Sequence, residues 1–128
     1  MISQITSGIK VSVETFFQPA HSDYNRAHFV FAYSITIEND GDCSIQLKRR
    51  HWHIIDGYGM QREVEGEGVV GEQPVIEPGQ SYQYVSGCDL HTEVGKMYGT
   101  YLMQRSTNAE LFEVTIPTFM MVVPYKMN

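Results

Sequence analysis

FVFAYSITI, residues 29–37, places a large apolar side chain at every second position. Side chains two residues apart share one face of a β-strand, so this stretch predicts a strand with one buried face. Six further segments have the extended or alternating pattern of strands: residues 9–17, 45–55, 60–64, 82–85, 97–104 and 112–123. About seven strands separated by turn signals predict an all-β fold, an immunoglobulin or fibronectin type III-like antiparallel β-sandwich.

Length and composition limit the classes of protein that this chain can belong to. The 128 residues correspond to one domain, residues 1–128, and a hydrophobic share of 42% excludes a disordered chain. A net charge of −6 repels a phosphate backbone, so we predict no nucleic-acid partner. The first eight residues lack the pattern of a signal peptide, and no apolar run approaches a membrane span. We therefore predict a cytoplasmic protein without a membrane partner, in which Cys43 and Cys88 are reduced.

Glycine and proline mark the predicted turns and irregularities. Residues 39–42 (NDGD) interrupt the alternation, and Asp-Gly supplies the positive φ of a tight hairpin turn. Residues 65–80 contain four glycines and two prolines, which predicts a long loop with short extended pieces at residues 69–70 and 75–76. Gly99 and Pro117 lie inside predicted strands, where they indicate a bulge, an edge strand or a close backbone approach.

The long loop contains a G-x-G-x-x-G motif formed by Gly66, Gly68 and Gly71. A dinucleotide fingerprint needs a helix after this motif, whereas here Glu72-Gln73-Pro74 follows. The neighbouring glutamates repel anions, so a structural glycine loop is the favoured interpretation. Binding of a pyrophosphate-like ligand by Gly66, Gly68 and Gly71 is the alternative.

His51-Trp52-His53 places two imidazoles on one strand face and the tryptophan on the other. We expect Trp52 to be buried, because it is the one tryptophan of the chain and lies opposite the polar face. His51 and His53 are candidate metal ligands if His91 or a carboxylate supplies a third donor. The alternative is a partly exposed polar face, and Arg49 on that face opposes a cation.

Several segments resemble the ApaG family over residues 11–124. The resemblance is carried by GEGVVGEQP (66–74), PG (78–79), YVSG (84–87) and GKMYGTY (95–101), with RHWHIID (50–56) upstream and FEVTIP (112–117) downstream. One departure is Thr92-Glu93, where the family often has Thr-Pro. The resemblance implies a fibronectin-type sandwich without catalytic residues, linked to magnesium and cobalt homeostasis and efflux.

Two functions from different classes follow. The first is a non-enzymatic module, without a cofactor, that binds a protein partner through a loop or a sheet surface; an open sheet edge also permits a homodimer. The resemblance supports this function, because the same domain occurs as a partner-binding module in larger eukaryotic proteins. The second is direct binding of a divalent cation or a pyrophosphate-like ligand through the glycine-rich loop.

Overall fold

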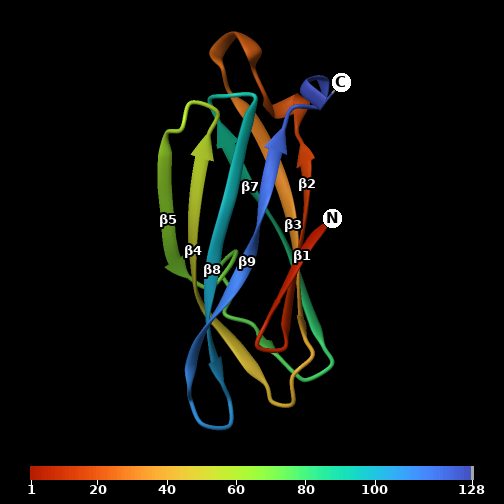
Figure 1. The fold of residues 1–128 in the computed structure, drawn as a ribbon, viewed down its shortest axis with the longest axis vertical. Helices are drawn as coiled ribbons and strands as arrows, with labels where there is room; N and C mark the ends of the chain where they lie inside the picture. Colours follow the sequence, from red (N-terminus) through yellow and green to blue (C-terminus); the bar gives the residue numbers. More distant parts are fainter. Residues whose placement is uncertain (128) are drawn as a thin grey trace.

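The computed structural model describes residues 1–127, and within them the chain forms two antiparallel β-sheets packed face to face (Figure 1). The described strands are β1 (Ile2–Thr6), β2 (Ile9–Phe17), β3 (Phe29–Asn39), β4 (Ile45–Asp56), β5 (Gln61–Glu67), β6 (Val75–Ile76), β7 (Ser81–Leu90), β8 (Val94–Arg105) and β9 (Leu111–Val122). Three short 3₁₀ helices accompany them: η1 (Pro19–His21), η2 (Tyr24–Arg26) and η3 (Pro124–Met127). None of the helices among these residues is long and apolar enough to cross a membrane. The predicted antiparallel sandwich is confirmed.

The strand order explains how the sheets are built. One sheet has the order β1-β2-β3-β7, and the other has the order β5-β4-β8-β9. The short β6 pairs with the first residues of β4. It lies along the same edge of β4 that pairs with β5 later in the strand. Within the described residues, β5, β6 and β7 therefore form the open edges of the two sheets on one side of the sandwich, and β1 and β9 form those on the other.

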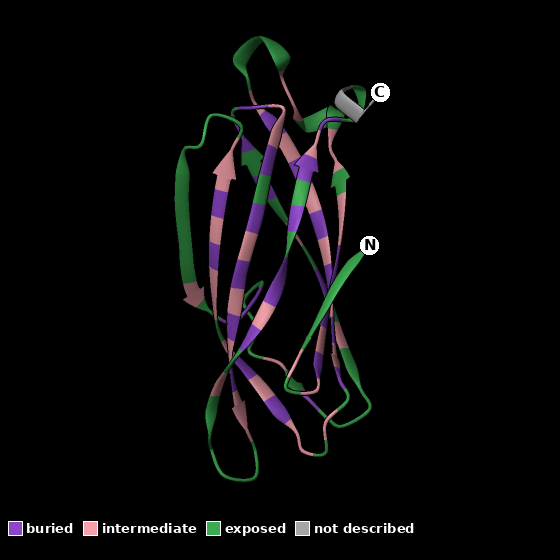
Figure 2. Ribbon diagram, viewed as in Figure 1, coloured by how far each residue is buried: buried purple, intermediate pink, exposed green. Residues whose placement is uncertain are grey.

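Burial follows the alternation of the sequence. In β3, Phe29, Phe31, Tyr33, Ile35 and Ile37 are all buried, and the residues between them are partly exposed (Figure 2). Trp52 in β4 is 2% exposed, as predicted. Its ring centroid lies 5.5 Å from that of Tyr33 in the facing sheet and 5.8 Å from that of Phe119 in its own sheet. Trp52 thus joins the two sheets at the centre of the core.

The sequence prediction missed one strand and misassigned one turn. β1 was missed, because its side chains are mostly exposed and leave no buried alternation in the sequence. Residues 39–42 do not form a hairpin: β3 and β4 lie in different sheets, and Gly41 has no positive φ. Asn39 is fully buried here, and its side-chain amide donates to the carbonyls of Cys43 and Ile76. A side chain that satisfies two carbonyls can hold a connection between sheets that a tight turn cannot make.

The predicted irregularity at Gly99 and Pro117 is confirmed. The β8–β9 register shifts between Met97 and Gly99, so that two residues of β9, Pro117 and Thr118, oppose Tyr98. A Cβ on Gly99 would lie 2.0 Å from the carbonyl oxygen of His51. Gly99 is therefore a site of close backbone approach, and Pro117 occupies a bulge on the edge strand β9.

Buried tyrosine hydroxyls in the core make the stability of the fold depend on pH. The hydroxyls of Tyr84 and Tyr101 share a hydrogen bond between the sheets, and burial raises the pKa of both, as it does for Tyr33. The pKa of these phenols in the folded protein exceeds the unfolded value of about 10. Their contribution to the free energy of unfolding is therefore fully present below that pH and is lost as the pH rises. We therefore expect stability to fall as pH rises above about 10, with the core phenols ionising as the chain unfolds.

This expectation is checked by recording phenolate absorbance and circular dichroism through an alkaline titration. The late absorbance step should coincide with the loss of circular dichroism, and Tyr101→Phe should remove one phenolate from that step. Ionisation of all eight tyrosines near pH 10, with the circular dichroism unchanged, would contradict it.

Candidate functional site

The glycine motif lies partly in a strand and partly in a tight turn. Gly66 belongs to β5 and pairs with Arg50 of β4, so the predicted loop of residues 65–80 was too long at its start. Val75 and Ile76 form β6, as the extended piece predicted there, because they pair with the first residues of β4. Gly68 and Gly71 have positive φ values of 62° and 81°, which makes them turn positions.

Arg50 holds this turn through carbonyl oxygens. Its Nη1 donates to the carbonyls of Glu67 and Gly68, each at 3.0 Å. The backbone amide of Gly68 donates to Lys48, while those of Val69 and Glu72 donate to each other's carbonyls. A phosphate cradle needs amides that converge on one point, and these three are already bonded within the fold. The geometry favours a structural role for the motif, and ligand binding at Gly66, Gly68 and Gly71 stays a prediction.

The two predicted metal ligands lie together on the outer face of the sheet formed by β5, β4, β8 and β9. The side chains of His51 and His53 are 34% and 29% exposed, and their ring centroids are 4.5 Å apart. Antiparallel pairing places Glu65 opposite His51 and Glu63 opposite His53. The donor atoms of His51, His53 and Glu63 all lie within 4.8 Å of one another. The group that lies beside the two imidazoles is a carboxylate and not His91, and metal binding by His51 and His53 stays a prediction.

The contacts within this cluster are specific. Nε2 of His51 lies 3.0 Å from Oε2 of Glu63, and its Nδ1 lies 3.1 Å from Oε1 of Glu65. Nδ1 of His53 lies 3.8 Å from Oε1 of Glu63. The hydrogen bond with His51 lowers the pKa of Glu63, so this carboxylate is charged at neutral pH. We call His51, His53, Glu63 and Glu65 the histidine–glutamate cluster.

His91, the other donor considered, lies elsewhere. Its Nδ1 lies 3.2 Å from the carbonyl oxygen of Ala27, at the end of the sandwich where the β2–β3, β4–β5 and β7–β8 connections meet (Figure 1). Sequence reasoning did not identify Glu63 and Glu65. The signal was available, because folding the β4–β5 hairpin about its Asp56–Gly59 turn brings both glutamates opposite the histidines.

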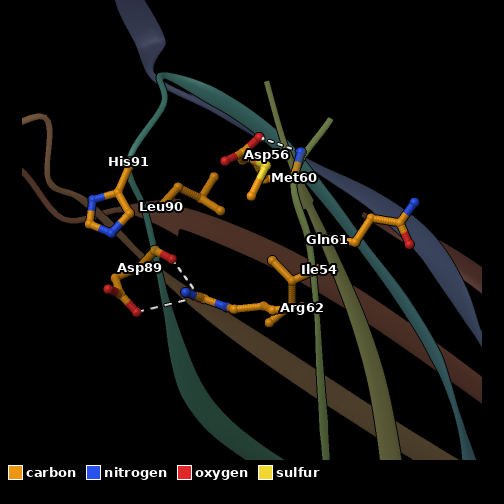
Figure 3. Close-up of a pocket in the computed structure, with 8 residues that line it drawn as sticks. All are labelled: Ile54, Asp56, Met60, Gln61, Arg62, Asp89, Leu90 and His91. Atoms are coloured by element: carbon orange, nitrogen blue, oxygen red, sulfur yellow. Dashed lines mark hydrogen bonds and ion pairs between the residues drawn. The ribbon is translucent and has the colours of Figure 1, made fainter. Parts of the chain in front are cut away.

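That end of the molecule, which we call the loop end, carries two pockets with His91 in the wall of both. The first, of about 270 Å³, has Ile54 and Leu90 among its apolar lining residues. Arg62 of β5 reaches across it to Asp89 of β7, with Nη2 3.4 Å from Oδ1 (Figure 3). This ion pair links the two sheets at their open edges. Sequence reasoning missed it, because nothing local marks two residues so far apart as partners.

The second pocket of the loop end, of about 400 Å³, is lined by aromatic side chains that solvent reaches. Tyr58 is 85% exposed and Tyr24 is 53% exposed, and both line it. Met60, which lines the first pocket, is 69% exposed. Large side chains left in solvent beside two adjoining hollows are typical of a binding surface.

Comparison with known proteins identifies relatives over nearly the whole chain. The model of the ApaG domain matches residues 19–105. The chain is 50% identical to Protein ApaG of Afipia carboxidovorans and 47% identical to Protein ApaG of Brucella anthropi, each over 97% of this chain and 95% of the relative. A solved structure from Bordetella pertussis, of a protein named ApaA, superposes with a TM-score of 0.88 at 42% identity, covering 91% of this chain and 94% of that one. These names denote no reaction. On the strength of the domain match and these identities, the chain belongs to the ApaG family.

Proposed function

We propose that this chain is a non-enzymatic interaction module that binds a protein partner at its loop end. The observation that carries the proposal is the exposure of Tyr58 and Met60 beside the two adjoining pockets. Tyrosine and methionine are enriched at protein interfaces, where they supply large contact areas. The rigid sandwich holds these side chains on loops, an arrangement that other sandwich domains use for recognition.

Charge around the pockets suits a partner with mixed polarity. Asp56, Arg62 and Asp89 surround the apolar lining of the first pocket. An apolar side chain entering this pocket would be framed by charged groups, the pattern of a hot spot with a polar rim. The link to magnesium and cobalt homeostasis and efflux belongs to the same proposal. It rests on family membership, and it makes the partner a component of that cytoplasmic system.

The partner is captured by placing a photo-crosslinking amino acid at position 58 in cells and, as a matched control, at position 111. Leu111 is 56% exposed and begins β9 at the opposite end of the sandwich (Figure 1). We expect a specific protein to crosslink from position 58 and not from position 111.

The captured protein is then purified and its affinity measured. Tyr58→Ala combined with Met60→Ala should weaken binding by about 10-fold or more, and Leu111→Ala should leave it unchanged, since a few central residues carry most of an interface's free energy. Equal affinity for both variants, or crosslinking from position 111 alone, would contradict the loop end as the binding surface.

A further inference from the structure

The histidine–glutamate cluster on the outer face of β4 and β5 has the composition of a transition-metal site. Its three mutually close donors are two imidazole nitrogens and one carboxylate oxygen, from His51, His53 and Glu63. Two histidines and one glutamate form a donor set that binds Zn²⁺ in proteins, with a water molecule in the remaining position. Imidazole suits zinc, cobalt, nickel and copper, whereas magnesium and calcium prefer a shell made of oxygen ligands.

The distances fit a site that needs small side-chain rotations to close. Metal–ligand bonds of about 2.0–2.1 Å place the donors of a tetrahedral site roughly 3.3 Å apart. Oε2 of Glu63 already lies 3.0 Å from Nε2 of His51, and Oε1 of the same carboxylate lies 3.8 Å from Nδ1 of His53. All three side chains are partly exposed, and that of Glu63 is 62% exposed. They can therefore adjust without disturbing the core.

Two neighbours orient the imidazoles. Glu65 lies 3.1 Å from Nδ1 of His51, which leaves Nε2 of that ring directed at Glu63. A carboxylate on the second nitrogen of a histidine is a recurrent feature of metal sites, because it fixes the tautomer and raises the basicity of the ligand. Tyr98 of β8 stacks on His53 with ring centroids 4.8 Å apart and planes 12° apart. Both rings thus have defined orientations.

The contacts within the cluster go beyond a ladder of directly opposed ion pairs, because one of them is diagonal. Pairing along β4 and β5 sets Arg49 opposite Glu67, His51 opposite Glu65 and His53 opposite Glu63. A simple ladder would join each base to the acid facing it. Instead His51 contacts both Glu63 and Glu65, and Glu63 faces both imidazoles. We propose that His51, His53 and Glu63 bind a divalent transition-metal ion on this sheet face, with Glu65 as the residue that positions His51.

The site is independent of the loop-end surface, so its test does not depend on the proposed partner. The tag-free protein is titrated with Zn²⁺ and with Co²⁺ by calorimetry, and the Co²⁺ complex is followed by visible absorption. We expect saturable binding of one ion per chain with micromolar affinity, and a Co²⁺ spectrum of nitrogen and oxygen coordination. Millimolar Mg²⁺ should not displace the ion, because a site with two imidazoles disfavours it.

Substitutions assign the ligands. His53→Ala and Glu63→Gln should each lower the affinity about 100-fold or more. Glu65→Gln should lower it about 10- to 100-fold and shift the Co²⁺ spectrum while the melting temperature stays unchanged. The matched control is His91→Ala, because His91 and His28 form another histidine pair, with ring centroids 6.5 Å apart and His28 3.5 Å from Asp89.

Each result decides the proposal. Loss of binding in His53→Ala and Glu63→Gln, with His91→Ala like the unchanged protein, supports it. Absence of saturable binding at submillimolar Zn²⁺ and Co²⁺ overturns it. Full affinity in His53→Ala, or equal loss in His91→Ala, also overturns it. Circular dichroism confirms that each variant is folded, which we expect because the substituted side chains lie outside the core.

Discussion

Replacing Gly68 with alanine is expected to lower the free energy of unfolding by about 3 kcal/mol, because two effects add. The new Cβ would lie 2.1 Å from the carbonyl oxygen of Glu72, a backbone atom that cannot move aside cheaply. The residue also has a φ of 62°, which disfavours any side chain. Urea unfolding followed by circular dichroism measures the loss.

Gly71 and Gly66 are the matched comparisons. Gly71 has a φ of 81° but nothing within 4 Å of its Cβ position, so Gly71→Ala should lose about 1 kcal/mol from conformation alone. A Cβ on Gly66 meets the end of the Arg50 side chain at 2.8 Å, and that end can shift. Gly68→Ala should therefore be the most damaging of the three. Equal losses at Gly68 and Gly71 would show that the contact with Glu72 is unimportant.

The unsubstituted protein tests whether the glycine motif binds a phosphate group. A structural turn predicts no rise in melting temperature with millimolar pyrophosphate, because a ligand stabilises only a protein that binds it. A clear rise that disappears in a folded Gly71→Ala variant would favour the ligand-binding alternative.

Removing the indole of Trp52 should produce the largest loss in the core. Trp52→Ala is expected to lower the free energy of unfolding by roughly 3–5 kcal/mol, a large part of the 5–15 kcal/mol of a typical domain. The reason is its position between Tyr33 and Phe119, where truncation leaves a cavity that the two sheets cannot close. Circular dichroism during urea unfolding is the measurement.

Trp52→Phe provides the conservative control, since it keeps an aromatic ring and should lose less. Tyr58→Ala removes an aromatic residue that is 85% exposed, and it should change stability by less than about 0.5 kcal/mol. Native tryptophan emission should be shifted to the blue of the free amino acid. An emission like that of free tryptophan, or a loss below about 1 kcal/mol in Trp52→Ala, would contradict the burial of this side chain.

The sequence predicted the fold best where one face of a strand is buried. Alternation over residues 29–37 correctly indicated which side chains of β3 face the core, and the same pattern placed Trp52 inside and His51 outside. It failed where burial is absent or where polar contacts decide. The exposed β1 has no such pattern, and the connection after Asn39 depends on a buried amide that bonds residue 76.

For the candidate sites too, local strand geometry predicted some residues, and the three-dimensional arrangement of the strands was needed for the others. His51 and His53 were predicted to share a face because that follows from strand geometry alone. Glu63 and Glu65 depend on the hairpin register, which follows from the exact turn. Arg62 and Asp89 meet only because two sheets close over each other, and no local pattern carries that information.

The strand order also sets when the protein can fold during its synthesis. β3 has β2 and β7 as neighbours, and β4 has β5 and β8, so each inner strand waits for a partner made much later. Roughly 40 residues separate Asn39 from Ser81, which a ribosome adding about 5–20 residues per second needs several seconds to make. During that time one edge of β3 lacks its strand partner, and β4 still waits for β8. Translation that stalls between β6 and β7 therefore leaves a half-built sandwich whose open strands favour aggregation.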